Sequence, residues 1–185
     1  MSSKETNLKE KFRIALNSTA KVISDDFELI NKSSEKDKKK ELSPIEIDNL
    51  TKPSDFIKLR AETDSSALKK KFSDEVIYRK NLPKNTSCKL LYSIAEKIRY
   101  ESIGSKMLKG IKTNLKNNYN QVISLKRKEE LKSKDNVAVS EAFELYMLKN
   151  FHNIELNHLT NKMLSFWESD FNKSIGLHIK YLKEN

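Results

Sequence analysis

Hydrophobic positions at the start of the chain recur every three or four residues. From Leu8 to Ile23 this spacing places the apolar side chains on one face of a helix. The aspartates at 25 and 26 end that helix. Two short segments within residues 27–47 alternate apolar and polar positions on either side of a Lys- and Ser-rich stretch. This pattern allows a short two-stranded β-hairpin near residues 27–47, which would need to pack on helices to be stable.

Helical spacing returns after Lys52-Pro53-Ser54, where Pro53 breaks the pattern and Ser54 is the predicted helix cap. The pattern predicts a helix over residues 55–72 and a short turn over residues 74–80. The longest predicted helix begins at residue 86 or 87 and runs to about residue 117. Its apolar stripe consists of Leu91, Ile94, Ala95, Ile98, Leu108, Ile111 and Leu115.

In the last third of the chain, the pattern predicts a segment with weak helical spacing and then two helices. Residues 117–134 are polar and Lys-rich, which favours a frayed helix or a loop. Asn136 caps a predicted helix that runs through Phe151. A final helix starts near residue 156, buries Phe166 and Trp167, and breaks near Gly176. The fold class is therefore mainly α, an irregular helical domain, and we expect a single domain over residues 1–185.

Composition supports helices and narrows the function classes. Three Gly and three Pro in 185 residues are too few for a turn-rich β fold. The net charge of +10 raises the question of nucleic acid, but only five of the 36 basic residues are Arg. Solvated helix faces explain this charge better than a polyanion site, so nucleic acid is not expected as a partner. The chain shows no secretory signal and no apolar run long enough to span a membrane, and we expect a cytoplasmic protein.

No sequence motif indicates an autonomous enzyme. The lone Cys88 can form neither an intramolecular disulfide nor a cysteine-rich zinc site. The three histidines, at 152, 158 and 178, lack the spacing of a helical zinc site. A phosphate-binding loop, a nucleophile elbow, a dinucleotide fingerprint and an Asp-x-Ser-x-Ser adhesion motif are also absent from the sequence. We therefore expect no catalytic residue, no metal ligand set and no cofactor bound by this chain.

One segment of the longest predicted helix is unusual for a helix. Gly104 and Gly110 lie inside it, although each Gly costs about 1 kcal/mol there relative to Ala. Close packing of a neighbouring backbone would explain them. Glu101 lies at helical spacing from apolar neighbours, and a buried carboxylate needs a partner.

The preceding helix carries Arg60 and Asp64, four residues apart and on one face. Pairing between helices, of Arg60 or Arg99 with Asp64 or Glu101, would satisfy the buried carboxylates. Two interpretations stay open: a structural polar network within the helical core, or a direct functional site.

The same segment carries a resemblance to a known family, CobT. Residues 96–115 resemble the CobT signature, in which an acidic and arginine-bearing helix precedes two spaced glycines and ends in Asn-Leu. Residues 60–68 resemble the family's Arg-Gly-x-x-Asp-x-x-Ala-Leu helix. Residues 141–145 and the Phe-Trp-Glu at 166–168 resemble later helices, so the resemblance spans about residues 10–182. The structural or interaction candidates are Arg60, Asp64, Glu96, Arg99, Glu101, Gly104, Met107, Gly110 and Trp167.

The resemblance implies a function in aerobic cobalamin synthesis. It implies a non-catalytic subunit of cobaltochelatase that assists ATP-dependent insertion of cobalt into hydrogenobyrinic acid a,c-diamide. The implied partners are an AAA+ ATPase subunit (CobS) and the large chelatase subunit (CobN), and the complex would use ATP, magnesium and cobalt. The family has Gly where this chain has Glu62. We also expect that the chain resembles only the N-terminal region of CobT, without the C-terminal von Willebrand-type domain that carries the family's metal-ion-dependent adhesion site.

Two other functions remain as alternatives. The chain could be an adaptor that binds another AAA+ ATPase through the same helical surface. It could also be a basic helical protein that binds nucleic acid, in which case its affinity would fall steeply with salt.

Overall fold

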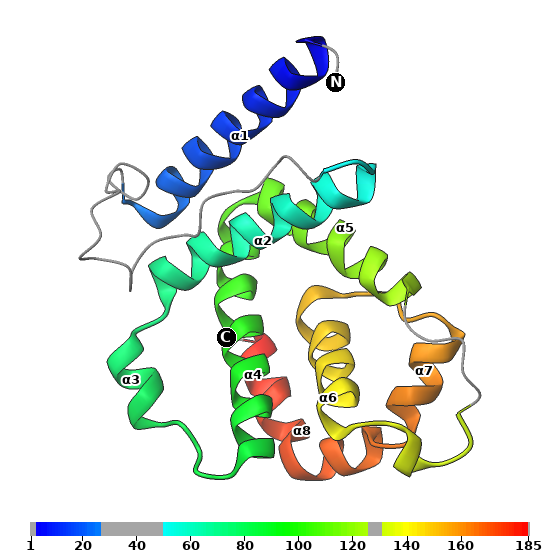
Figure 1. The fold of residues 1–185 in the computed structure, drawn as a ribbon. Helices are drawn as coiled ribbons and strands as arrows, with labels where there is room; N and C mark the ends of the chain where they lie inside the picture. The colour runs from blue at the N-terminus through cyan, green and yellow to red at the C-terminus, as the bar shows by residue number, and fades with distance from the viewer. Residues whose placement is uncertain (1–2, 27–49, 126–130, 185) are drawn as a thin grey trace. The chain divides into compact units, whose positions relative to one another are not determined.

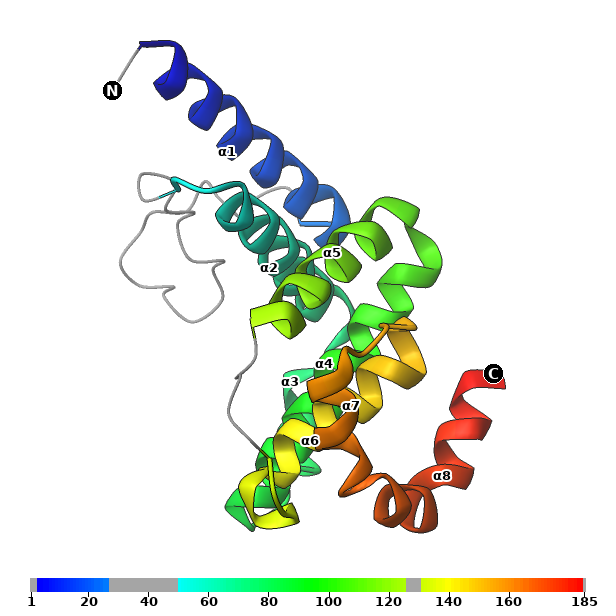
Figure 2. The same ribbon diagram turned by 90° about the vertical axis from the view of Figure 1, so that its right-hand side faces the viewer.

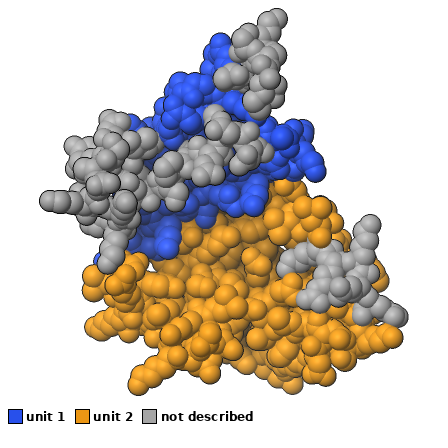
Figure 3. Space-filling model, in the orientation of Figure 1, with its two compact units in different colours: residues 1–74 blue, residues 75–185 orange. Residues whose placement is uncertain are grey.

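The computed structural model describes residues 3–26, 50–125 and 131–184 as helices and their connections (Figure 1). These residues include no strand, which confirms the mainly α prediction. The β-hairpin predicted near residues 27–47 lies outside the described residues. The chain divides into two compact units, residues 1–74 and residues 75–185, where the sequence predicted a single helical domain (Figure 3). Each unit is described by itself.

In the described part of unit 1 two helices pack against each other, α1 (Ser3–Ser24) and α2 (Pro53–Phe72). Phe12 and Phe56 meet edge to face, with ring centroids 5.1 Å apart. The helix α1 ends as predicted, because Asp25 takes the left-handed conformation with φ 56. The side chains buried in this unit include Leu16, Ala20, Ile23, Ala61, Ala67 and Leu68.

The start of α2 corrects the predicted cap. Pro53 occupies the first helical position, where its missing N–H costs nothing. The carboxylate of Asp55 accepts hydrogen bonds from the backbone N–H groups of Lys52 (2.9 Å) and Thr51 (3.1 Å). Ser54, the predicted cap, lies inside the helix. Asp55 therefore organises this end, where a negative charge also suits the helix dipole.

Unit 2 is built around α6 (Val139–Met147), which contacts four other helical elements. Ala142, Phe143, Leu145, Tyr146 and Met147 are buried, and the other residues of this short helix are half-buried. Figure 2 shows α6 beside α4 and α7. The other elements are α3 (Glu75–Lys80), α4 (Thr86–Met107), α5 (Lys109–Leu125), the 3-10 helix η1 (Lys134–Asn136), the π-helix η2 (Leu148–His152), α7 (His158–Ser165) and α8 (Glu168–Glu184).

The longest predicted helix is two helices. The chain leaves α4 at Leu108, which is extended (φ −130, ψ 108), and α5 begins at the next residue. The change of direction turns the apolar stripe of α5 inward, with Ile111, Leu115, Tyr119 and Ile123 buried. The prediction of a frayed segment from residue 117 was wrong up to Leu125, because Tyr119 and Ile123 extend that buried stripe.

Three more boundaries differ from the predicted ones. Residues 75–80 form α3 rather than a turn. The helix predicted from residue 136 begins at Val139 and continues after Met147 as the π-helix η2. The final helix is divided into α7 and α8. The predicted break near Gly176 is wrong, because α8 continues through this residue to Glu184.

Candidate functional site

The most polar part of the core of unit 2 is a cluster of Glu101, Tyr119 and His152. They come from α4, α5 and the end of η2, and their exposed fractions are 0%, 4% and 5%. The Tyr119 hydroxyl donates a hydrogen bond of 2.5 Å to Oε2 of Glu101. The rings of Tyr119 and His152 lie 5.5 Å apart. A carboxylate predicted on the apolar face of a helix is thus buried and hydrogen-bonded across to a second helix.

The electrostatics of the cluster keep His152 neutral. Its Nε2 lies 3.6 Å from Glu101 Oε2, beyond hydrogen-bond distance, and accepts or donates no hydrogen bond within the described ranges. Burial, reinforced by the positive charges of Lys97 and Lys112, lowers the pKa of His152 to about 4. At neutral pH the imidazole of His152 is therefore uncharged, so it forms no ion pair with Glu101.

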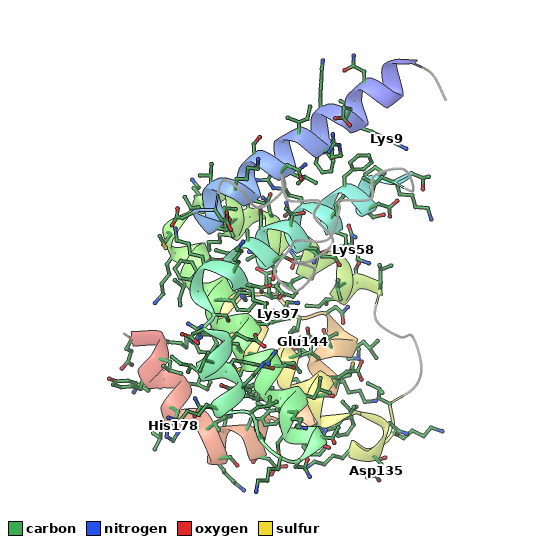
Figure 4. All side chains as sticks on the ribbon, turned by 60° about the vertical axis from the view of Figure 1, so that its left-hand side comes forward. Lys9, Lys58, Lys97, Asp135, Glu144 and His178 are labelled. Atoms are coloured by element: carbon green, nitrogen blue, oxygen red, sulfur yellow. The ribbon has the colours of Figure 1, made fainter. Side chains whose placement is uncertain are left out.

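Tyr119 is the stable hydrogen-bond donor of the cluster. Burial first, and then the charge of Glu101, raises the pKa of its hydroxyl, so the proton stays on the phenol at every physiological pH. The ammonium group of Lys97, labelled in Figure 4, lies 5.4 Å from the centre of the Tyr119 ring. Closed to solvent, these side chains can connect three helical elements but cannot meet a dissolved substrate. This geometry favours the structural interpretation of Glu101.

The other predicted ion-pair residues contact partners on their own helices. In unit 1, Arg60 Nε lies 3.3 Å from Oδ2 of the fully buried Asp64, one turn later in α2. Arg60 also donates to the Thr19 hydroxyl of α1, at 3.4 Å. In unit 2, the guanidinium of Arg99 donates to both carboxylate oxygens of Glu96, at 2.7 and 2.8 Å. An arginine–carboxylate pair between helices stays a prediction.

The two glycines of the unusual segment lie in different environments. Gly104 is buried near the end of α4, and its carbonyl accepts the N–H of Leu108 at 2.9 Å. Gly110 is exposed, and a methyl group there would meet nothing within 4 Å. The prediction that a neighbouring backbone packs closely against Gly110 is therefore wrong, because the helix break turns that position toward open space. Met107, the last residue of α4, is 58% exposed.

The candidate residues described above all lie within the part of the chain that matches a known family. The family model described as cobalamin biosynthesis protein CobT matches residues 6–185. The chain belongs to the CobT family. No curated protein and no solved structure matches the chain. The candidate residues of both units thus fall within the CobT match.

Trp167 connects α7 and α8 in this CobT-family chain. Its indole N–H donates to the Val137 carbonyl at 3.2 Å, and its ring stacks on Phe171. The Lys134 ammonium lies 4.0 Å from the ring centre. The sequence placed Trp167 on the stripe of a continuous helix, whereas the structure places it half-buried at a junction, where it holds the 3-10 segment η1.

Sequence reasoning did not assign a role to Tyr119 or His152. Tyr119 fell within residues 117–134, where the sequence predicted a frayed helix or a loop, although it follows Leu115 by four residues and so continues the buried stripe of α5. His152 gave no local signal, because it ends a π-helix that apolar spacing does not reveal.

The described ranges contain no group of three or more His, Cys, Asp or Glu side chains that could hold a metal ion. In the same ranges, no helix combines the length and the apolar character needed to cross a membrane.

Proposed function

We propose that this chain is a non-catalytic subunit of the ATP-dependent aerobic cobaltochelatase. Membership of the CobT family indicates a role in cobalamin biosynthesis, and the match over residues 6–185 is the observation that carries the proposal. In this role the chain assists the insertion of cobalt into hydrogenobyrinic acid a,c-diamide. The complex works in the cytoplasm and consumes ATP with magnesium.

The proposed partners are the AAA+ ATPase subunit, CobS, and the large subunit, CobN, which holds the corrinoid substrate. In this division of labour the chain supplies binding surfaces rather than reacting groups. The closed cluster of Glu101, Tyr119 and His152 supports that division, since its titratable groups are buried and contact one another between helices. Cobalt is a substrate of the complex, and ATP is bound by the ATPase subunit.

Reconstitution from three purified proteins tests the proposal. Cobalt insertion is followed by the absorbance change of the corrinoid, with all three proteins and with each one omitted. We expect insertion only in the complete mixture with ATP, and no ATP hydrolysis by this chain alone. Full insertion without this chain would overturn the proposal.

The same mixtures separate the alternatives. An adaptor of another AAA+ ATPase would leave cobalt insertion unchanged and would bind an ATPase from outside the chelatase. A nucleic-acid-binding protein would retain DNA or RNA with an affinity that falls in proportion to the phosphates neutralised as salt is raised.

A further inference from the structure

The junction between α4 and α5 carries an unusual concentration of positive charge. Lys106, Lys109, Lys112 and Lys116 are all exposed there, and residues 102–128 contain no Asp or Glu at all. Two exposed apolar side chains lie between these lysines, Met107 (58%) and Leu108 (46%). We call these six residues the basic corner.

The lysines of the basic corner lack the partners that other basic side chains of unit 2 have. Lys149 pairs with Glu168 at 2.9 Å, Lys134 pairs with Asp170, and Arg79 pairs with Glu75 at 2.6 Å. No ion pair joins Lys106, Lys109, Lys112 or Lys116 to any acidic residue in the part of the chain that the structure describes.

The local arrangement makes this charge unfavourable for the isolated chain. Lys109 and Lys112 stand in the first turn of α5, which has no acidic residue, although the dipole of a helix favours negative charge at this end. Lys112 and Lys116 are four residues apart on one helix, where like charges repel. A ligand of opposite charge would relieve both effects.

The break at Leu108 also gives the basic corner a shape. Figures 1 and 2 show α5 turning away from the axis of α4 at this point. A surface hollow of about 550 Å³ follows the turn, and its lining includes the four lysines and Met107. A second hollow of about 250 Å³ adjoins it, sharing Lys106 and Lys112 and reaching Asn150 and Lys183. The corner therefore offers a concave path rather than a flat surface.

We propose that the basic corner is the docking site for an acidic segment of a partner protein that also carries apolar side chains. Charge complementarity brings such a segment to the four lysines and steers its approach. Its apolar side chains cover Met107 and Leu108, and the flexible thioether of Met107 adapts to their shape. This inference deepens the proposed function and rests on it, because the partner would be another subunit of the chelatase.

The chemistry of the corner favours a protein segment over nucleic acid. The six residues of the corner include no arginine to fork onto phosphates and no aromatic ring on which a base could stack, and the one aromatic side chain that lines the adjoining hollow, Phe151, is half-buried. A phosphate backbone would satisfy the lysines but leave the two apolar side chains exposed. An acidic segment with apolar residues satisfies both.

A defined probe tests the site on the full chain. The probe is a fluorescently labelled peptide of alternating Glu-Glu-Leu units, and its binding is measured by fluorescence anisotropy. Two comparison ligands are the same peptide with Ser in place of Leu, and a single-stranded DNA of equal charge. We expect the Leu peptide to bind more tightly than both, and less tightly as salt is raised.

Matched variants localise the binding. Changing Lys106, Lys109, Lys112 and Lys116 to Glu should weaken the Leu peptide by about tenfold or more. Changing four exposed lysines elsewhere in unit 2 (Lys84, Lys89, Lys162 and Lys180) alters the net charge equally and should leave the affinity within about twofold. The double change Met107→Ser and Leu108→Ser should remove the preference for Leu over Ser in the peptide. All substituted positions are exposed, and circular dichroism verifies that each variant is folded.

Two results would overturn the docking site. One is that the four corner changes weaken binding no more than the four control changes do, whether both sets weaken it equally or the corner variant binds normally. The other is tighter binding of the DNA than of the Leu peptide.

The reconstituted cobalt-insertion assay separates this inference from the proposed function. If insertion needs the chain but the corner variant binds the peptide normally, the inference fails alone. If the corner binds the peptide but insertion does not need the chain, the proposed function fails.

Discussion

Among the described residues, each unit has one fully buried carboxylate, and the two are stabilised in different ways. Asp64 of unit 1 contacts Arg60, one turn earlier on the same helix. Glu101 of unit 2 accepts a hydrogen bond from Tyr119, on the next helix, and lies beside His152, which is farther along the chain. The first arrangement follows from helical spacing alone, whereas the second exists only after three elements have packed.

The two arrangements also respond differently to acid. Arginine as a residue type stays charged at any pH that a folded protein tolerates. The imidazole beside Glu101 is held neutral by burial, and its protonation in the unfolded chain competes with folding. The core of unit 2 should therefore be the acid-sensitive one.

The largest expected effect is the pH dependence caused by His152. Its pKa is about 4 in the folded protein and 6.5 in an unfolded chain, so the stabilisation is complete above pH 6.5 and is lost as the pH falls toward 4. The loss should reach about 3 kcal/mol. Urea unfolding is followed by the fluorescence of Trp167, the single tryptophan, which lies in unit 2.

Histidine variants isolate that contribution from other titrating groups. His152→Gln should flatten the pH dependence over this range. His158→Gln, at an exposed position, should leave it as in the parent chain. An unchanged loss of stability in His152→Gln would show that the acid sensitivity of unit 2 arises elsewhere.

The second effect concerns the local pair. Arg60→Gln removes a charged partner from the buried Asp64 and the contact with Thr19, which should lower the free energy of unfolding by about 2 kcal/mol. Thermal unfolding followed by circular dichroism measures it. Arg79→Gln breaks a pair of exposed side chains and should cost less than about 0.5 kcal/mol. Equal effects of the two changes would mean that burial of Asp64 adds nothing to the pair.

The third effect tests the hydrogen bond across helices. Tyr119→Phe removes the donor to Glu101 while keeping the ring, and should cost about 1–2 kcal/mol. Tyr78→Phe is the matched control, because the Tyr78 ring stacks on Tyr92 and no hydrogen bond of its hydroxyl is described. The midpoint of the Trp167 transition should move for the first variant only. If the midpoint moves equally for both variants, the hydrogen bond from Tyr119 to Glu101 contributes no more to stability than the Tyr78 hydroxyl does.

The smallest effect has the opposite sign. Gly110→Ala places a methyl group in open space on a helix, so it should stabilise unit 2 by about 0.5 kcal/mol through helix propensity. Gly104→Ala should instead destabilise, because Gly104 is buried at the end of α4. The melting temperatures of the two variants test both predictions. Stabilisation by Gly104→Ala would show that space is available there as well.

Helical spacing alone was enough to predict several features. The apolar stripes of α1 and α2 predicted both described helices of unit 1, although α1 begins at Ser3 rather than at Leu8. The four-residue spacing of Arg60 and Asp64 predicted that they share a face, and the stripe around Glu101 predicted that a carboxylate would be buried and would need a partner. These features depend on neighbours one helical turn apart, whose distance is the same in every α-helix.

Tertiary packing decided what spacing could not encode. The break at Leu108 falls inside an apolar pattern that predicts one continuous helix. The break depends on how α5 folds back to bury Ile111, Leu115 and Tyr119. The partners of Glu101 follow from that break and from the π-helix that ends at His152. Many apolar pairings of the stripes have similar burial energies, since hydrophobic attraction has no direction. Only the assembled helices select the side chains that meet.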